Sequence, residues 1–276
     1  MEFGGRTGTR IGADPRARGA SGSHRALTGH ILGMADGAGY GAALIDAAEG
    51  TMTTWPQFAQ TVRAAADGLR RRGLRVGDTV GIFVADAASH VVAVQAVRAA
   101  GATARPVRPA PTADIAAELA ACRARLLITS ASLAEVAVQA AERSWVRQVF
   151  AFGEAPGTTP FGALLDVAEP AEPQANGRAD RARRPGTMPI PDPARFGQAS
   201  GLRLTPWDVV VAGPPCGDPA AYTSLLDLAL IAGATIVAAP ADQITAAVDA
   251  YHGTAAIVLD GTRVEGLPAA QVFGVG

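Results

Sequence analysis

Cysteine and histidine are the side chains of this sequence suited to nucleophilic catalysis or metal binding, and they are few. Cys122 and Cys216 lie far apart in different predicted elements, so we expect neither a disulfide framework nor a cysteine zinc site. Cys216 stands beside Gly217 and is a candidate nucleophile, but no histidine is near it in the sequence, and we favour a small, half-buried cysteine after a strand. The histidines are dispersed and lack the spacing of a metal site: His24, His30, His90 and His252.

Lysine is absent from the sequence, and all 24 basic residues are arginine. Codon bias in a GC-rich genome is a sufficient cause of this composition. The chemical consequence holds whatever the cause, because a polypeptide without lysine cannot perform a reaction that requires a lysine of its own. The formal net charge of −1 gives no reason to expect nucleic acid or an anionic membrane surface as a partner.

The length and hydropathy of the chain indicate a globular protein. Its 276 residues suffice for one large domain or two small ones, and an apolar share of 49% is enough for a sizeable core. No uninterrupted apolar run reaches the roughly eighteen residues of a membrane helix, and the N-terminus lacks the apolar core of a signal peptide. We therefore expect a cytoplasmic protein with no membrane association.

The stretch from residue 51 to residue 109 organises the prediction, because it alternates strands with helices. Thr54 and Gln57 have the spacing of a capping box, and the helix that they begin ends before Gly73. Short apolar runs at 79–85 and 102–107 are typical of buried parallel strands. The helix between them, 87–100, carries His90, which we expect to be a packing or surface residue.

The same alternation of elements covers most of the remaining chain. We expect a hairpin formed by 43–46 and 51–54. Further strands are expected at 126–129, 146–152, 208–213, 234–239, 254–259 and 271–275. Further helices are expected at 27–35, 113–123 (capped by Thr112), 131–143, 220–232 and 243–251. Strands that alternate with helices favour an α/β fold with mainly parallel, helix-flanked sheets.

Two subdomains are expected, because the pattern fails in the middle of the chain. Residues 1–26 are rich in Gly and Arg and are expected to form a disordered tail. Residues 27–152 form the first α/β subdomain in this prediction, and residues 201–276 form the second. The intervening 153–200 is rich in Pro, Gly, Arg and Asp and is expected to be a linker or loop.

Two long stretches of the sequence resemble one family. TTWPQF…AAADGLRRRGLRVGDTVGIFV…AGATARPV and LRLTPWDVVVAGPP…LALIAGATIVAAP are similar to the N-terminal domain of the adenylate-forming superfamily, the acyl-CoA synthetases and AMP-dependent synthetases and ligases. The resemblance covers about residues 27–152 and 201–276. It implies two α/β subdomains, and it identifies the chain as a truncated, degenerate relative that ends before the later motifs and the C-terminal domain.

The family's reaction, formation of an acyl-adenylate from a carboxylate and ATP, implies further site residues. Its phosphate loop, T-S-G-T-T-G-x-P-K-G, has two incomplete counterparts here, Gly157-Thr158-Thr159 and Gly186-Thr187, and neither includes a lysine. Ordinary turns are the competing interpretation of both, since Pro-Gly is common turn chemistry. The family's P-L-x-H near the acyl pocket corresponds to residues 215–218, where Cys216 and Asp218 are the weak substrate-site candidates and the histidine is missing.

These observations predict a family homologue that is not catalytic alone and acts as a binding or partner protein. We expect a homodimer, or a complex with a ligase or carrier protein, formed through the second subdomain. No cofactor is expected, and ATP, AMP or CoA would be relevant only if activity is retained. The alternative is half of a split ligase completed by a second chain. An unrelated dinucleotide-binding enzyme is disfavoured, because the turn DAASH after the strand at 79–85 has no glycine.

Overall fold

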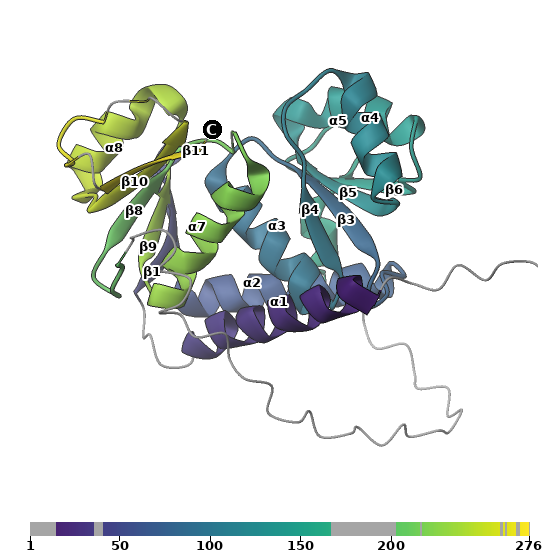
Figure 1. Ribbon diagram of the computed structural model, residues 1–276, viewed down its shortest axis with the longest axis horizontal. Helices are drawn as coiled ribbons and strands as arrows, with labels where there is room; N and C mark the ends of the chain where they lie inside the picture. The colour runs from purple at the N-terminus through teal and green to yellow at the C-terminus, as the bar shows by residue number, and fades with distance from the viewer. Residues whose placement is uncertain are drawn as a thin grey trace, which may run out of the picture.

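The structure is a computed structural model that describes residues 15–35, 41–166, 203–215, 217–259, 262, 264–268 and 271–275, with the side chains of 15–24 left out. Two sheets dominate the fold (Figure 1). The six-stranded sheet has the order β11-β10-β8-β9-β1-β2. Its strands are β1 (Ala42–Asp46), β2 (Thr51–Thr54), β8 (Val209–Ala212), β9 (Thr235–Ala238), β10 (Ala255–Leu259) and β11 (Val272–Val275).

The five-stranded sheet has the order β4-β3-β5-β6-β7, and all its neighbouring strands are parallel. Its strands are β3 (Thr79–Phe83), β4 (Thr103–Pro106), β5 (Ala124–Ser130), β6 (Gln148–Phe152) and β7 (Thr159–Pro160). In the other sheet only the β1–β2 pair is antiparallel. The prediction of an α/β fold with two mainly parallel, helix-flanked sheets is therefore confirmed.

Helices form the middle and the outside of the molecule (Figure 1). Between the sheets lie α3 (Ala87–Ala99) and α7 (Pro219–Ala232), and α1 (Pro15–Met34) and α2 (Trp55–Arg71) run across the bottom of the view beneath them. The outer faces are covered by α4 (Thr112–Ala121) and α5 (Ala134–Glu142) on one side and α8 (Ile244–Tyr251) on the other. The first half of α2 packs in the core of the six-stranded sheet and the second half in the core of the five-stranded sheet, so this helix joins the two.

The two sheets repeat one topology. In each, a first strand is followed by a helix and a neighbouring strand, and the chain then crosses to the other side of the first strand, giving β4-β3-β5 and β9-β8-β10. Asp78 and Asp208 occupy equivalent turns, because each accepts a hydrogen bond from the backbone N–H three residues earlier, at 2.8 and 2.7 Å. The helices α3 and α7 are the equivalent elements that follow, and their N-caps are Asp86 and Asp218.

Local sequence signals explain several of the helix ends. Thr54 accepts a hydrogen bond from the backbone of Gln57, whose side chain accepts one from the backbone of Thr54, so the predicted capping box is present. Gly233 ends α7 with a φ of +76°, a conformation that glycine adopts without steric cost. Thr112 is not the predicted cap of α4: it is the first helical residue, and Pro111 precedes it without a side-chain cap.

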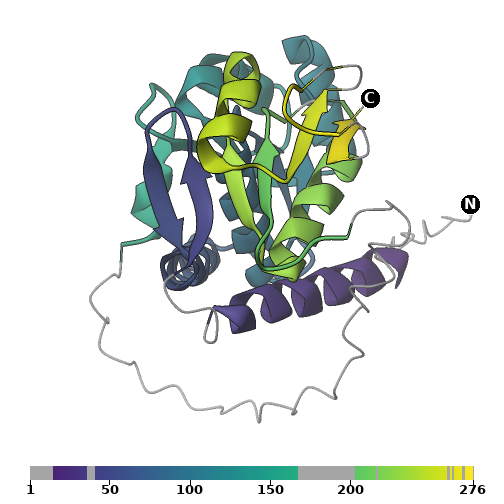
Figure 2. The same ribbon diagram turned by 90° about the vertical axis from the view of Figure 1, so that its left-hand side faces the viewer.

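The boundaries of the two units differ from the sequence prediction in three places. The hairpin β1–β2, expected within the first subdomain, pairs through β1 with β9 (Figure 2, purple hairpin). Part of the expected linker belongs to the unit of the five-stranded sheet, since β7 pairs with β6 and a short 3-10 helix, η2 (Phe161–Leu164), packs on α2. The helix α1 begins at Pro15, inside the expected tail, and continues to Met34. Residues 167–202 lie outside the described residues.

Candidate ligand-binding site

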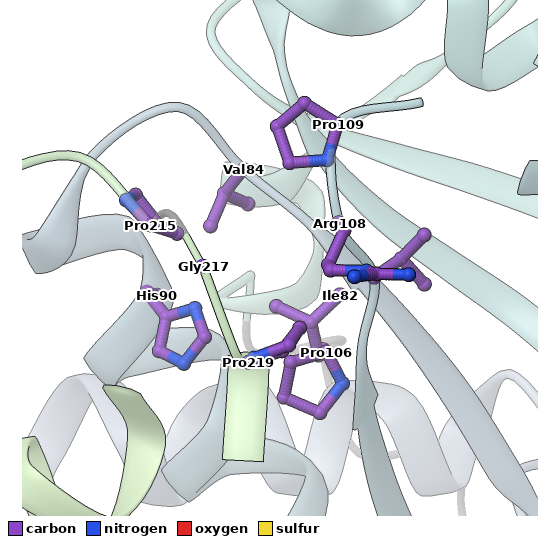
Figure 3. A pocket seen from close by; sticks show the side chains of 10 residues that line it. Ile82, Val84, His90, Pro106, Arg108, Pro109, Pro215, Gly217 and Pro219 are labelled. Atoms are coloured by element: carbon purple, nitrogen blue, oxygen red, sulfur yellow. The ribbon is translucent and has the colours of Figure 1, made fainter. Parts of the chain in front are cut away.

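A small pocket lies between the two sheets, beyond the carboxyl ends of β3, β4 and β8 (Figure 3). This is where an open α/β sheet ordinarily binds its ligands, because the loops that leave the strands diverge there. The space between the atoms, including the open mouth, is about 270 Å³, and the enclosed part has room for about one water-sized group. The lining residues are Ile82, Val84, His90, Pro106, Val107, Arg108, Pro109, Pro215, Gly217 and Pro219.

The walls of the pocket are apolar and stiff. Ile82 and Val84, at the end of β3, are buried and form one wall. The other walls come from the segments after β4 and after β8, which together contribute four prolines. Proline has a fixed φ and no N–H group, so these walls offer shape and apolar contact but few hydrogen bonds.

His90 supplies the buried polar group of the pocket. It lies in the first turn of α3, which begins because Asp86 accepts a hydrogen bond from the backbone N–H of Ser89 at 2.7 Å. The His90 side chain is 2% exposed. Burial, together with the positive charge of Arg98, lowers its pKa from 6.5 to about 3, so the ring is neutral at physiological pH.

A chain of hydrogen bonds assigns the tautomer of His90. The Thr223 hydroxyl donates its proton to the carbonyl oxygen of Pro219 at 2.7 Å. The same hydroxyl oxygen lies 2.9 Å from Nε2 of His90. Because the hydroxyl proton is already used, Nε2 must be the donor in this second bond, and Nδ1 is left as a bare acceptor.

The ring of His90 is also fixed by its aromatic neighbour. Tyr222 meets it edge to face, with ring centroids 5.2 Å apart, and donates its hydroxyl proton to the carbonyl of Gly213 at 2.7 Å. His90 and Tyr222 are each the fourth residue after the capping aspartate of their helix, so they are equivalent positions in the repeated topology. The repeat therefore places the two rings face to edge between the sheets.

A buried polar cluster lies farther along the same two helices. Arg98 donates to both carboxylate oxygens of Asp227 at 2.8 Å, and Gln95 donates to the same carboxylate at 2.8 Å. Thr28 of α1 in turn donates to the Gln95 carbonyl at 2.6 Å. The cluster connects α1, α3 and α7, and within the described residues Nε of Arg98 is its one buried polar atom without a partner.

Of the predicted phosphate-loop residues, the structure describes Gly157, Thr158 and Thr159, and these lie away from the pocket. Thr158 donates to the carbonyl of Ala155, Thr159 accepts from Gln148, and Gly157 has a φ of +73°, which is the geometry of an ordinary turn. This turn packs on Val138 of α5, on the outer side of the five-stranded sheet. The other predicted loop residues, Gly186 and Thr187, lie outside the described residues.

The substrate-site candidates are close to the pocket in the sequence but differ in role. Asp218 is exposed and caps α7 by accepting from the backbone N–H of Ala220 at 2.8 Å, so it has a structural task. Cys216 is itself outside the described residues, although its neighbours Pro215 and Gly217 line the pocket.

The sequence prediction missed His90 as a site residue, although it expected a packing role there. The side chains that bury and orient it, Tyr222 and Thr223, come from a helix more than 130 positions later. Where the structure describes the chain, no three acidic, histidine or cysteine side chains gather as metal ligands, and none of the described helices is long and apolar enough to cross a membrane.

Comparisons with known proteins agree with this architecture. The family model described as AMP-binding enzyme matches residues 36–193. A long-chain-fatty-acid-CoA ligase from Archaeoglobus fulgidus has a similar structure, with a TM-score of 0.65 and 19% identity over 85% of this chain and 51% of that one. A benzoate CoA ligase from Burkholderia xenovorans LB400 has a TM-score of 0.64 and 20% identity over 89% of this chain and 54% of that one.

An amide bond synthetase from Marinactinospora thermotolerans is similar as well, with a TM-score of 0.61 and 19% identity over 85% of this chain and 48% of that one. This chain thus spans about half the length of the solved structures that it matches. Comparison with curated protein sequences gives no match.

Proposed function

Because the chain belongs to the AMP-binding enzyme family, we propose that it is a binding homologue that does not form acyl-adenylates alone. The absence of lysine from the sequence carries this proposal. In the family's reaction, lysines stabilise the phosphates of ATP and the charge that develops between carboxylate and α-phosphate. Removing one such preorganised donor lowers the rate by about 10²–10³, and arginine does not replace lysine where a compact point charge is required.

The described residues support the same proposal. In the turn at Gly157–Thr159, the Thr158 hydroxyl already donates to the carbonyl of Ala155, the Thr159 hydroxyl accepts from Gln148, and the turn packs on Val138 of α5. The pocket at His90 has enclosed space for about one water-sized group, so this pocket does not hold a nucleotide in the described conformation.

A pyrophosphate-release assay tests the proposal. The purified chain is supplied with ATP, magnesium and either a fatty acid or benzoate, and calorimetric titration measures its affinity for ATP. We expect no carboxylate-dependent pyrophosphate and no ATP binding at millimolar concentration. Turnover by the purified single chain would overturn the proposal.

We further propose that the six-stranded sheet mediates association with a second copy of the chain or with another protein of its family. Support comes from the edge strands. In the five-stranded sheet the edges carry Arg105, Pro106 and Pro160, which discourage strand pairing, whereas β11 consists of Val-Phe-Gly-Val without charge or proline. The remaining edge, β2, is mostly threonine.

Light scattering at tens of micromolar measures this association. Phe273 packs against the core, so the exposed Gly274 is the better position for a charge. Gly274→Arg is expected to give a monomer, and Gly162→Arg, at an exposed site with open space in η2 beside the five-stranded sheet, is the control. A wild-type monomer would contradict the proposal.

The alternative function is half of a split ligase, and membership of the AMP-binding enzyme family supports its ligase ancestry. In that case a second chain supplies the lysines. Purification of the tagged chain from its own cells, followed by the pyrophosphate assay, distinguishes the two: activity that depends on a co-purified chain supports the split ligase.

A further inference from the structure

A second hollow lies in the angle between α1 and α2, where Figures 1 and 2 show α1 running obliquely below α2. Its volume is about 310 Å³. Sites for small molecules occupy about 300–1,000 Å³, so this hollow is large enough for a small ligand. The lining residues, all of them described, are Arg25, Thr28, Gly29, Leu32, Arg63, Ala66, Asp67, Arg70 and Ala99.

Helical spacing explains why these residues face one hollow. The lining positions are 25, 28, 29 and 32 on α1, and 63, 66, 67 and 70 on α2. Both sets follow the i, i+3, i+4, i+7 pattern of a single helix face. Leu32 and Ala66 are buried and lie at the bottom of the hollow, so its floor is apolar.

The charged side chains make the hollow positive. Three arginines, Arg25, Arg63 and Arg70, line it together with one acidic residue, Asp67, so the net charge of the lining is +2, three less one. Arg25 makes no hydrogen bond or ion pair with another described residue. An anion is therefore the ligand that this lining attracts.

The two arginines of α2 are held in position with donors to spare. Nη2 of Arg63 donates to the carbonyl oxygen of Leu32 at 3.1 Å. Arg70 donates to the Asp67 carboxylate at 2.6 Å and to the carbonyl oxygen of Ala99. A guanidinium has five N–H donors, so each of these side chains keeps donors for a ligand while its own contacts restrain it.

The charges are spread along the hollow, and this spacing selects among anions. Arg63 and Arg70 are seven positions apart on α2, which is about 10 Å between their Cα atoms, and Asp67 lies between them. A compact dianion such as phosphate would meet the Asp67 carboxylate between the two arginines. A molecule with a carboxylate at each end and a carbon chain between them matches the alternation of charge and the apolar floor.

We propose that the hollow between α1 and α2 binds a small linear dicarboxylate, whose two carboxylates pair with the arginines and whose carbon chain lies over Leu32 and Ala66. This inference goes beyond the proposed function and does not rest on it. Carboxylate-dependent pyrophosphate release would refute that function and leave this site in place, whereas failure of the titration below would refute this inference alone.

Titration of the full-length ¹⁵N-labelled chain with adipate tests the proposal, at low ionic strength because salt screens exposed arginines. The backbone amide resonances of Gly29 and Ala99, which line the hollow, are the readout, and we expect adipate to shift both to saturation. Hexanoate has the same chain length with one carboxylate, and hydrogen phosphate concentrates its charge at one point. Each is expected to bind about fivefold more weakly than adipate, the upper range for the loss of one exposed ion pair.

Arg25→Gln is the most direct variant, because Arg25 has no partner among the described residues whose loss would disturb the fold. It should weaken adipate binding about fivefold. Arg143→Gln, which changes an exposed arginine after α5 and outside the lining, is the matched control and should leave binding unchanged. Asp67→Asn should strengthen phosphate binding, because no carboxylate then lies between the arginines.

Three results would overturn the inference. The first is the absence of amide shifts at Gly29 and Ala99. The second is hexanoate or phosphate binding to the wild-type chain as tightly as adipate. The third is an equal effect of Arg25→Gln and Arg143→Gln on adipate binding, with circular dichroism showing that both variants keep the wild-type fold.

Discussion

The buried pair of Arg98 and Asp227 provides the sharpest test of how α3 and α7 hold the two sheets together. The side chains are 7% and 11% exposed, and one guanidinium nitrogen lies 2.8 Å from both carboxylate oxygens. Removal of one partner of a buried pair leaves a charge uncompensated and costs about 3–5 kcal/mol. We therefore expect Arg98→Met and Asp227→Leu each to lower the free energy of unfolding by that amount.

The two single variants should not be equal. Asp227→Leu leaves both the guanidinium and the Gln95 amide without their acceptor, whereas Arg98→Met leaves the carboxylate with the Gln95 hydrogen bond. Arg98→Met also removes Nε, which has no partner among the described residues. Since an unsatisfied buried group costs about 1–3 kcal/mol, Asp227→Leu is expected to be the more destabilising change.

The double variant separates the pair from its surroundings. Replacement of a buried ion pair by apolar residues of similar volume is often neutral or stabilising by about 1–4 kcal/mol, and the orphaned Gln95 amide offsets about 1–3 kcal/mol of this. Arg98→Met/Asp227→Leu should therefore lie within about 2 kcal/mol of wild type, with a coupling energy above about 3 kcal/mol. Urea unfolding followed by circular dichroism measures all four proteins at constant slope.

The control is Asp67→Asn, because Asp67 and Arg70 form an exposed pair, 61% and 43% accessible, in which a single substitution should cost at most about 1 kcal/mol. Single variants at Arg98 and Asp227 that each cost less than about 1 kcal/mol and add in the double variant would refute the reasoning. That result would mean that water reaches the pair and that the sheets do not depend on it.

Three further predictions concern other parts of the fold, and urea unfolding measures each. Thr54→Ala removes the capping box of α2 and should cost about 1 kcal/mol. Gly68→Ala should destabilise by about 1–3 kcal/mol because a Cβ would lie 2.1 Å from the carbonyl oxygen of Leu164, whereas Gly29→Ala, with no atom within 4 Å, should stabilise by about 0.5–1 kcal/mol. The pKa of His90 is about 3 in the folded chain against 6.5 when unfolded, so as pH falls the unfolded chain binds a proton first. Stability should therefore fall by about 1.4 kcal/mol per pH unit between pH 6.5 and about 3, and His90→Phe should reduce this slope.

The sequence allowed the elements to be predicted, because the signals for helices and strands are local. The capping box at Thr54, the apolar strand at 79–83 and the glycine after α7 each act within a few residues. The partner of a strand is not local information. The sequence prediction assigned the hairpin β1–β2 to the first subdomain, together with the elements that follow it. In the structure the mostly apolar β1 pairs in parallel with β9 of the six-stranded sheet, about 190 residues later.

The candidate site was less predictable for the same reason. His90 becomes a neutral acceptor only because Thr223 fixes its tautomer and Tyr222 covers its ring, and both belong to α7. One sequence signal was available, namely the repetition of an aspartate before a strand and of AGAT before the next strand, at residues 78 and 100–103 and again at 208 and 232–235. An alignment of these two halves would have placed His90 opposite Tyr222 and Gln95 opposite Asp227.

The same repeat explains why the binding site and the stabilising pair lie on one helix interface. Equivalent positions of α3 and α7 meet twice, first as His90 with Tyr222 and then as Gln95 with Asp227. At the first meeting the helices begin near the ends of the strands, so the diverging loops leave space for a ligand. At the second meeting the helices are buried between both sheets, so a polar contact there is stable only when its charged groups are paired, as Arg98 and Asp227 are. A change of the Arg98–Asp227 pair that shifts α7 along α3 should therefore also move Thr223 away from His90, and the ¹⁵N resonances of the His90 ring measured in Asp227→Leu would detect that coupling.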